Sequence, residues 1–146
     1  MLKKAISAGI LVATLGFVGC NTTLPGAAMQ QENLSTLQSQ AWTLTHIGNS
    51  AVKSSNPATL QFDPMQQRVS GSDGCNRLMG GYDADAKKIS FTQLASTKMM
   101  CMDNMKEVDA FNQALEKVTG YQAYNKSLRL LDRNGNVLLK FSGAAR

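Results

Sequence analysis

Two short stretches of the chain hold the residues that decide its fold: VSGSDGCNRLMGGY, residues 69–82, and TKMMC, residues 97–101. The first is rich in glycine, and Gly71 and Gly74 permit tight or left-handed backbone conformations that other residues avoid. Asn76 can bond neighbouring backbone groups in an Asx-turn. These residue types are typical of a turn that the fold itself requires, and the same groups are candidates for a binding motif.

On both sides of these stretches, apolar and polar residues alternate as they do in half-buried β-strands. The run WTLTHI, residues 42–47, is predicted to place Trp42, Leu44 and His46 on one face. Other runs alternate in the same way: residues 59–62, 68–71 and 88–92. The pair Asn134-Gly135, between residues 128–131 and 137–141, suits the positive φ angles of a hairpin turn.

One segment departs from this pattern and has apolar residues at helical spacing. Asp103 or Asn104 can cap the start of this helix, and Gly120 can stop it. Its apolar positions are Val108, Phe111, Ala114, Leu115 and Val118. We therefore expect an α+β fold in residues 41–146, a small antiparallel β-sheet or open barrel with one amphipathic helix packed on it.

The N-terminus has the features of an export signal. Lys3 and Lys4 precede an apolar run, residues 5–18, which is shorter than the roughly 20 residues of a transmembrane helix. The run ends in FVGC, residues 17–20, which resembles the lipobox of bacterial lipoproteins. We expect a signal peptide in residues 1–19 and a lipid on Cys20, and the alternative is an ordinary secretory signal with a chance cysteine.

Lipidation of Cys20 has consequences for location and for the segment that follows. Stable anchoring needs at least two acyl chains, as the lipoprotein cysteine carries. Asn21 takes the place of the Asp that signals inner-membrane retention in such lipoproteins, so we expect the outer membrane, on its periplasmic face. Residues 20–40 are polar and are predicted to be a lipidated N-terminus with a flexible tether.

The cysteine count supports one disulfide. The chain has three cysteines, and lipidation of Cys20 leaves Cys75 and Cys101. In an oxidising periplasm two remaining thiols usually pair. The bridge would close a loop of about 27 residues and contribute roughly 3–4 kcal/mol of stability. The alternative is two separate free thiols, buried as small hydrophobes.

The two stretches together resemble the META domain of the HslJ family of envelope lipoproteins. The residues that match its pattern are Trp42, Phe62, Gly71, Cys75, Asn76, Thr97, Met99, Cys101, Phe111 and Leu130. The resemblance implies a small β-rich domain with one helix, here residues 41–146, and an association with heat and antibiotic stress. It also adds Thr97 and Met99 to Gly71, Gly74 and Asn76 as a structural or binding motif. It implies no catalytic mechanism.

A catalytic role would require a nucleophile, a base and an orienting group. Cys75 with His46 and Asp73 is the available cysteine–histidine set, and a disulfide would remove its nucleophile. We therefore expect no enzyme, no catalytic residue and no cofactor. The expected role is a stress-related binding or scaffold function at the membrane, for an envelope protein or a small apolar ligand.

A soft-metal site is the alternative function. Soft sulfur ligands, which select Cu(I), are concentrated at Met99, Met100, Cys101, Met102 and Met105. Cys75 and His46 could complete such a site. Methionine also fills irregular gaps in protein cores, and strand alternation would send Met100 and Met102 to the face opposite Met99. We therefore expect no metal, with copper handling in the periplasm as the competing hypothesis.

The charge of the chain argues against nucleic acid as a partner. The formal net charge is +5, but Lys3 and Lys4 belong to the export signal, and 13 basic residues against 10 acidic ones remain without them. These charges are scattered and not interleaved with aromatic residues, whereas nucleic-acid binding needs a clustered basic surface. We expect a monomer whose constant partner is the membrane that holds its lipid.

Overall fold

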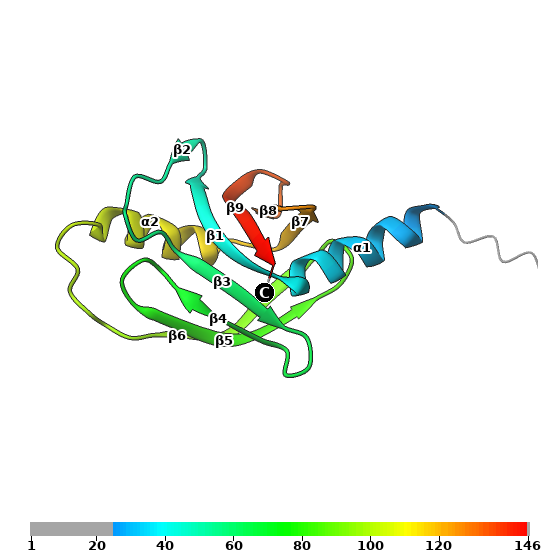
Figure 1. The fold of residues 1–146 in the computed structure, drawn as a ribbon, viewed down its shortest axis with the longest axis horizontal. Coiled ribbons are helices and arrows are strands. Elements are labelled where there is room, and N and C mark those ends of the chain that lie inside the picture. The colour runs from blue at the N-terminus through cyan, green and yellow to red at the C-terminus, as the bar shows by residue number, and fades with distance from the viewer. Residues whose placement is uncertain (1–24, 146) are drawn as a thin grey trace, which may run out of the picture.

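The computed structural model describes residues 25–145, which form nine strands and two helices (Figure 1). The elements are α1 (Pro25–Ser39), β1 (Gln40–Ile47), β2 (Ser50–Ala51), β3 (Thr59–Asp63), β4 (Arg68–Ser72), β5 (Arg77–Ala84), β6 (Ile89–Ser96), α2 (Met105–Leu115), β7 (Gly120–Tyr124), β8 (Ser127–Leu131) and β9 (Val137–Ala145). The signal peptide predicted for residues 1–19 and the lipidation predicted at Cys20 lie outside the described residues.

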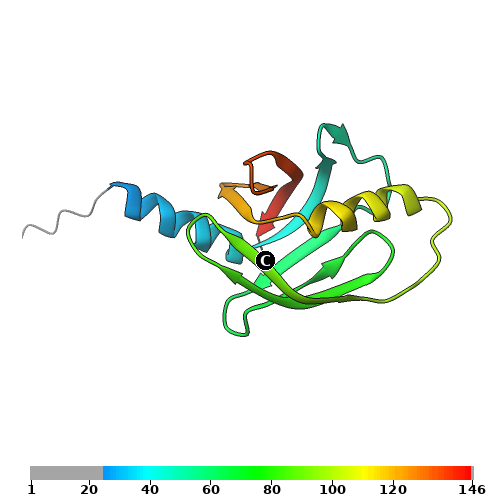
Figure 2. The same cartoon turned by 180° about the vertical axis from the view of Figure 1, so that it is seen from behind.

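All the strands belong to one curled antiparallel sheet. Its order is β6-β5-β4-β3-β1-β9-β8-β7, and β2 pairs with β1. The two edge strands approach each other at one end, where Ile89 N–H donates to the Thr119 carbonyl and Tyr121 N–H donates to the Lys87 carbonyl. Elsewhere β6 and β7 separate, so the sheet forms a half-barrel (Figure 2). The predicted α+β class with an open barrel is confirmed.

The concave face of the sheet holds the core. Alternation along each strand buries the predicted positions, among them Trp42, Leu60 and Phe62. The Phe62 ring packs edge-on against Tyr82 with centroids 5.1 Å apart. The pattern that predicted the strands is therefore the pattern of burial.

A β-bulge in β1 corrects one detail of the prediction. Leu44 pairs with Phe141, but His46 pairs with Lys140, so β1 has one extra residue at this point. The alternation then reverses. Ile47 lies opposite Leu139 and packs against the core, while His46 leaves the face that holds Trp42 and Leu44.

Helix α2 covers the open side of the half-barrel at the end opposite α1 (Figures 1 and 2). Val108, Phe111 and Leu115 are its buried positions, and the Phe111 ring meets Phe141 at 6.5 Å. This helix was predicted, but two of its boundary residues act differently. Gly120 begins β7 instead of stopping the helix, and Asn104, at the N-cap, makes no side-chain cap hydrogen bond.

Helix α1 overturns the prediction of a flexible tether in residues 20–40 for the part that the structure describes. Leu37 is completely buried, and the Trp42 indole donates to the Leu37 carbonyl at 2.9 Å. The Asn33 side chain bonds the Ala86 carbonyl and the Ala123 amide, which joins α1 to the β5–β6 turn and to β7. The domain thus includes α1 and does not begin at Ala41. Within residues 25–145, no helix is long and apolar enough to cross a membrane.

Because Leu37 is fully buried, we expect Leu37→Ala to lower the free energy of unfolding by about 3 kcal/mol. Ser35→Ala, on the exposed side of α1, is the matched control and should change it by less than about 0.5 kcal/mol. Urea unfolding followed by tryptophan fluorescence measures both, since Trp42 contacts Leu37. Equal, small effects of the two substitutions would show that α1 does not pack on the sheet.

Candidate functional site

The residues of the glycine-rich stretch build a tight turn between β4 and β5 around the carboxylate of Asp73. This side chain is only 3% exposed. Its Oδ1 accepts from the amides of Cys75, at 3.0 Å, and Asn76, at 2.6 Å. Its Oδ2 accepts from the side-chain amides of Asn76, at 3.1 Å, and Asn112 on α2, at 3.0 Å. We call residues 73–76 the carboxylate turn.

Hydrogen bonding decides the charge state of Asp73. Burial disfavours the charged form and acts to raise the pKa of Asp73. The four donors, led by Asn112, favour the charged form more strongly, so the pKa lies below its ordinary value of 3.8. Asp73 is therefore an ionised acceptor at neutral pH, with both oxygens engaged.

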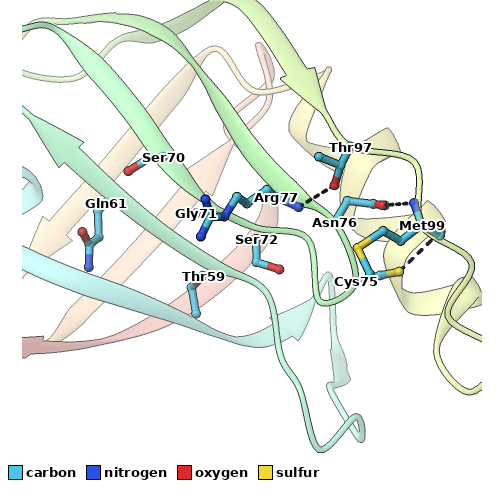
Figure 3. Close-up of a pocket in the computed structure, with 10 residues that line it drawn as sticks. All are labelled: Thr59, Gln61, Ser70, Gly71, Ser72, Cys75, Asn76, Arg77, Thr97 and Met99. Atoms are coloured by element: carbon cyan, nitrogen blue, oxygen red, sulfur yellow. Dashed lines mark hydrogen bonds between the residues drawn. The ribbon is translucent and has the colours of Figure 1, made fainter.

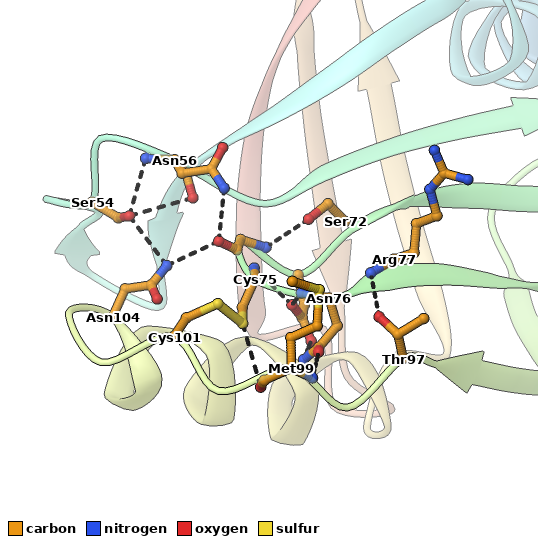
Figure 4. Close-up of a disulfide and its surroundings, with 12 residues drawn as sticks. Ser54, Asn56, Ser72, Cys75, Asn76, Arg77, Thr97, Met99, Cys101 and Asn104 are labelled. Atoms are coloured by element: carbon orange, nitrogen blue, oxygen red, sulfur yellow. Dashed lines mark hydrogen bonds between the residues drawn. A yellow bond between two sulfur atoms is a disulfide. The ribbon is translucent and has the colours of Figure 1, made fainter.

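The carboxylate turn fastens the second stretch, residues 97–101, to the sheet (Figure 4). The Asn76 side-chain oxygen accepts from Met99 N–H at 2.6 Å. Thr97 Oγ1 accepts from Arg77 N–H at 3.0 Å, and Thr97 N–H donates to the Arg77 carbonyl at 3.1 Å. Asn76, Thr97 and Met99, three residues of the motif, are thus brought together, and each makes a contact that positions the loop.

The predicted disulfide is confirmed: Cys75 and Cys101 are joined, with Cα atoms 5.9 Å apart. This distance is typical of a disulfide. The Cys75 sulfur also lies 3.6 Å from the Met99 carbonyl oxygen. This is a close contact and not a hydrogen bond, because an oxidised sulfur has no proton to donate. The alternative of two separate free thiols does not describe this domain.

Both glycines of the predicted motif have structural reasons. Gly74 has φ +97°, and its carbonyl accepts from the side chains of Asn56, at 2.8 Å, and Asn104, at 3.0 Å. A Cβ on Gly71 would overlap the Thr59 carbonyl of the neighbouring strand. Asn104 is therefore used to hold the turn, which explains why its side chain does not cap α2.

Sequence reasoning missed the three asparagines that complete this network, Asn56, Asn104 and Asn112. Each reaches the carboxylate turn from a distant segment, with sequence separations of 18, 30 and 39 residues. In a sequence, an asparagine that holds a turn cannot be told apart from an ordinary surface asparagine in a loop or on a polar helix face. Asn112 donates to Asp73, whereas Asn56 and Asn104 donate to the Gly74 carbonyl. The sequence does not show that these acceptors need side-chain donors, because it does not show that the turn is buried.

The cysteine–histidine set is not assembled as a reaction centre in this structure. Cys75 is oxidised, and the Asp73 oxygens are engaged by donors from the turn and from α2. His46 lies on β1, where its Nδ1 is 3.1 Å from Thr45 Oγ1. Within residues 25–145, no hydrogen bond connects His46 to either of the other two.

The methionines are exposed, contrary to the idea that they fill gaps in the core. Met100 is 91% and Met102 is 88% exposed, and Met99 and Met105 are exposed as well. They lie on the loop between β6 and α2 and at the first turn of α2. Among the described residues, no group of three His, Cys, Asp or Glu side chains is placed to hold a metal ion.

A shallow groove of about 530 Å³ lies beside the carboxylate turn (Figure 3). Its floor is the outer face of β3 and β4, with Thr59, Gln61 and Ser72. Arg77 lies at the start of β5, and Thr97 and Met99 form one wall. The motif therefore does two things: it closes the turn on its inner side and shapes a polar surface on its outer side.

Comparison with known proteins agrees with the sequence pattern. The family model of the META domain matches residues 35–145. An NMR structure of a protein from Burkholderia xenovorans is 28% identical with a TM-score of 0.61, and the match covers 100% of both chains. A second NMR structure is 26% identical with a TM-score of 0.57, covering 74% of this chain and 92% of the other.

The fold is also shared with a more distant protein. The crystal structure of a DUF4847 family protein from Bacteroides vulgatus is 15% identical with a TM-score of 0.58, covering 77% of this chain and 97% of that one. No curated protein matches this chain.

The carboxylate turn predicts a specific loss of stability in Asp73→Asn. The new amide keeps one acceptor oxygen but directs a donor at the donors of Asn76 and Asn112. We expect the free energy of unfolding at pH 7 to fall by about 2–3 kcal/mol, because these bonds are made to a buried charge. Asp85→Asn is the matched control, since Asp85 accepts from Lys87 and Lys88 in an exposed turn.

The pH dependence of this loss has a definite sign. The folded pKa of Asp73 is depressed, so its contribution is complete above pH 3.8 and is lost as pH falls through the folded pKa. The difference in free energy of unfolding between the parent protein and Asp73→Asn should therefore be constant near neutral pH. It should become smaller below about pH 4. A gap that is independent of pH would mean that the carboxylate charge does not stabilise the turn.

Proposed function

Because this chain belongs to the META domain family, which suggests a stress-related protein, we propose that it is a membrane-anchored envelope lipoprotein with a non-catalytic binding or scaffold role. Its lipid is on Cys20, and its place is the periplasmic face of the outer membrane. Its partner is an envelope protein or a small ligand held during heat or antibiotic stress. The ligand expected from the sequence was apolar, whereas the groove beside the carboxylate turn is lined by polar side chains such as Thr59, Gln61 and Arg77.

One observation carries the non-catalytic part of this proposal. The polar groups of the motif are occupied within the fold: Asp73 accepts four hydrogen bonds, Asn76 holds Met99, and both cysteines form the disulfide. A reaction centre needs a nucleophile or a base with a lone pair that is accessible to the substrate. This arrangement instead favours a rigid surface against which a partner can bind.

The position of α1 determines how far the domain would lie from a lipid on Cys20. Cys20 precedes Pro25, the first residue of α1, by five positions, and α1 packs onto the sheet at Leu37 and Asn33. The five Cα–Cα steps from Cys20 to Pro25 span at most about 18 Å. A lipid on Cys20 would therefore keep the domain near the bilayer, and its reach would be set by α1 and not by a long tether.

The anchor and the disulfide are tested together by the intact mass of the protein extracted from envelopes. We expect an acylated chain beginning at Cys20, with no thiol that alkylates before reduction and two that alkylate after it. Cys20→Ala should lack the acyl mass and leave the membrane fraction. An unacylated parent protein overturns the anchor, and two reactive thiols before reduction overturn the disulfide.

Copper handling is a second candidate, favoured by the exposure of Met99, Met100, Met102 and Met105 on one segment. Thioethers are ligands that Cu(I) prefers. The disulfide removes both cysteines from such a site, so it would consist of methionines alone.

The copper candidate predicts Cu(I) binding in competition with a colorimetric chelator. Replacing all four of these methionines by leucine should abolish it, since leucine keeps the apolar volume without the sulfur. The control is the double variant Met65→Leu/Met79→Leu, which removes two exposed methionines outside the segment. Unchanged competition in the fourfold variant rejects the candidate and leaves the scaffold role untouched.

A further inference from the structure

A row of polar side chains crosses the outer face of the sheet and ends in the groove. Strand register pairs six residues in succession across β5, β4, β3, β1, β9 and β8: Arg77, Ser72, Thr59, Thr43, Ser142 and Ser127. Their neighbours along the strands point into the core, as Leu78, Leu60 and Trp42 do. Because successive side chains alternate between faces, the whole row faces outward.

The groove is fixed in shape at the Arg77 end of this row. Thr97 and Met99 form its wall and are held to Arg77 and Asn76 by hydrogen bonds. The disulfide at Cys75 ties the same loop a second time. A ligand in this groove would therefore meet groups that are already positioned, which reduces the ordering cost of binding.

Arg77 supplies the charged side chain of the groove. Its side chain is exposed and extends along the groove away from Thr97 (Figure 3). Within residues 25–145, no hydrogen bond or ion pair engages its guanidinium group, and no Asp or Glu is among the residues that line the groove. Arg68 lies on the same face but has an acidic residue beside it, because its cross-strand partner is Asp63.

We propose that this groove binds the anionic group, phosphate or carboxylate, of a hydroxyl-rich small molecule such as an acidic sugar. The planar fork of Arg77 matches the oxygens of either anion. Thr59 and Gln61 supply the small donors and acceptors that sugar hydroxyls need. The Ser72 hydroxyl accepts from Gly74 N–H at 3.1 Å and keeps its proton to donate to a ligand. The inference rests on the proposed binding role and names a ligand class for it.

A titration of the full chain tests this inference. The protein is purified in detergent, labelled with ¹⁵N and followed by two-dimensional NMR, with glucose 1-phosphate, glucuronate and neutral glucose as probes. We expect saturable shifts of the Gly71, Ser72 and Arg77 amides with at least one anion, with a Kd on the order of 1 mM, and none with glucose. Shifts with one anion alone identify which group is recognised, and no saturable shift with either anion overturns the proposal.

Two matched variants separate a site from general attraction to a basic surface. Arg77→Gln should weaken binding about tenfold, as loss of one charge-assisted contact predicts. Arg68→Gln removes the same charge from the same face and should leave the Kd unchanged. Equal weakening by both variants would overturn the groove as a specific site.

The outcomes also distinguish this inference from the proposed function. Absence of anion binding by a chain that is acylated at Cys20 rejects the groove ligand alone. Binding accompanied by release of free phosphate from glucose 1-phosphate supports the groove as an anion site and rejects the non-catalytic role.

Discussion

The buried carboxylate of Asp73 is the constraint on which the rest of this structure depends. A charge removed from water must be compensated by hydrogen bonds, or its burial costs several kcal/mol. Here the compensation comes from the backbone of its own turn and from side chains of the turn and α2. The requirement thereby fixes where α2 lies relative to the β4–β5 turn, and the position of α2 closes the open side of the sheet.

The connection between the two edge strands, β6 and β7, runs through an irregular segment and α2. The segment from Thr97 to Asn104 leaves β6, spans the opening without regular structure and enters α2. Its three methionines, Met99, Met100 and Met102, are exposed and contribute little burial, so packing alone does not hold the segment. The disulfide limits its freedom in the unfolded chain, while Asn76 and Thr97 position its backbone in the folded one. The two devices act on different states and complement each other.

Local pattern predicted the features that depend on local chemistry. Alternation gave the core positions Trp42, Leu60 and Phe62, helical spacing gave Val108 and Phe111, and cysteine count gave the disulfide. The docking of helix α1 was missed because few residues carry it. Leu34 and Leu37 are its apolar contacts with the core, Asn33 and Gln38 add hydrogen bonds, and two apolar side chains do not make a stripe along a helix of 15 residues. The bulge that turns Ile47 inward has no local signature. Asn56, Asn104 and Asn112 reach their partners only after the chain has folded.

The carboxylate turn has an inner and an outer side, and this explains how one motif can be structural and still shape a binding surface. The inner side of the carboxylate turn consumes its polar groups, and a group engaged in the fold has no capacity left for a ligand. On the outer side, β-strand alternation places short polar side chains where they cannot contact the core, and the hydroxyls of Ser72 and Thr97, each of which accepts one bond from the fold, still have a proton to donate. Arg77 belongs to both sides, since its backbone pairs with Thr97 while its guanidinium projects into the groove. The hydrogen bonds around the buried carboxylate of Asp73 therefore also fix the backbone of Arg77, whose exposed guanidinium faces the groove.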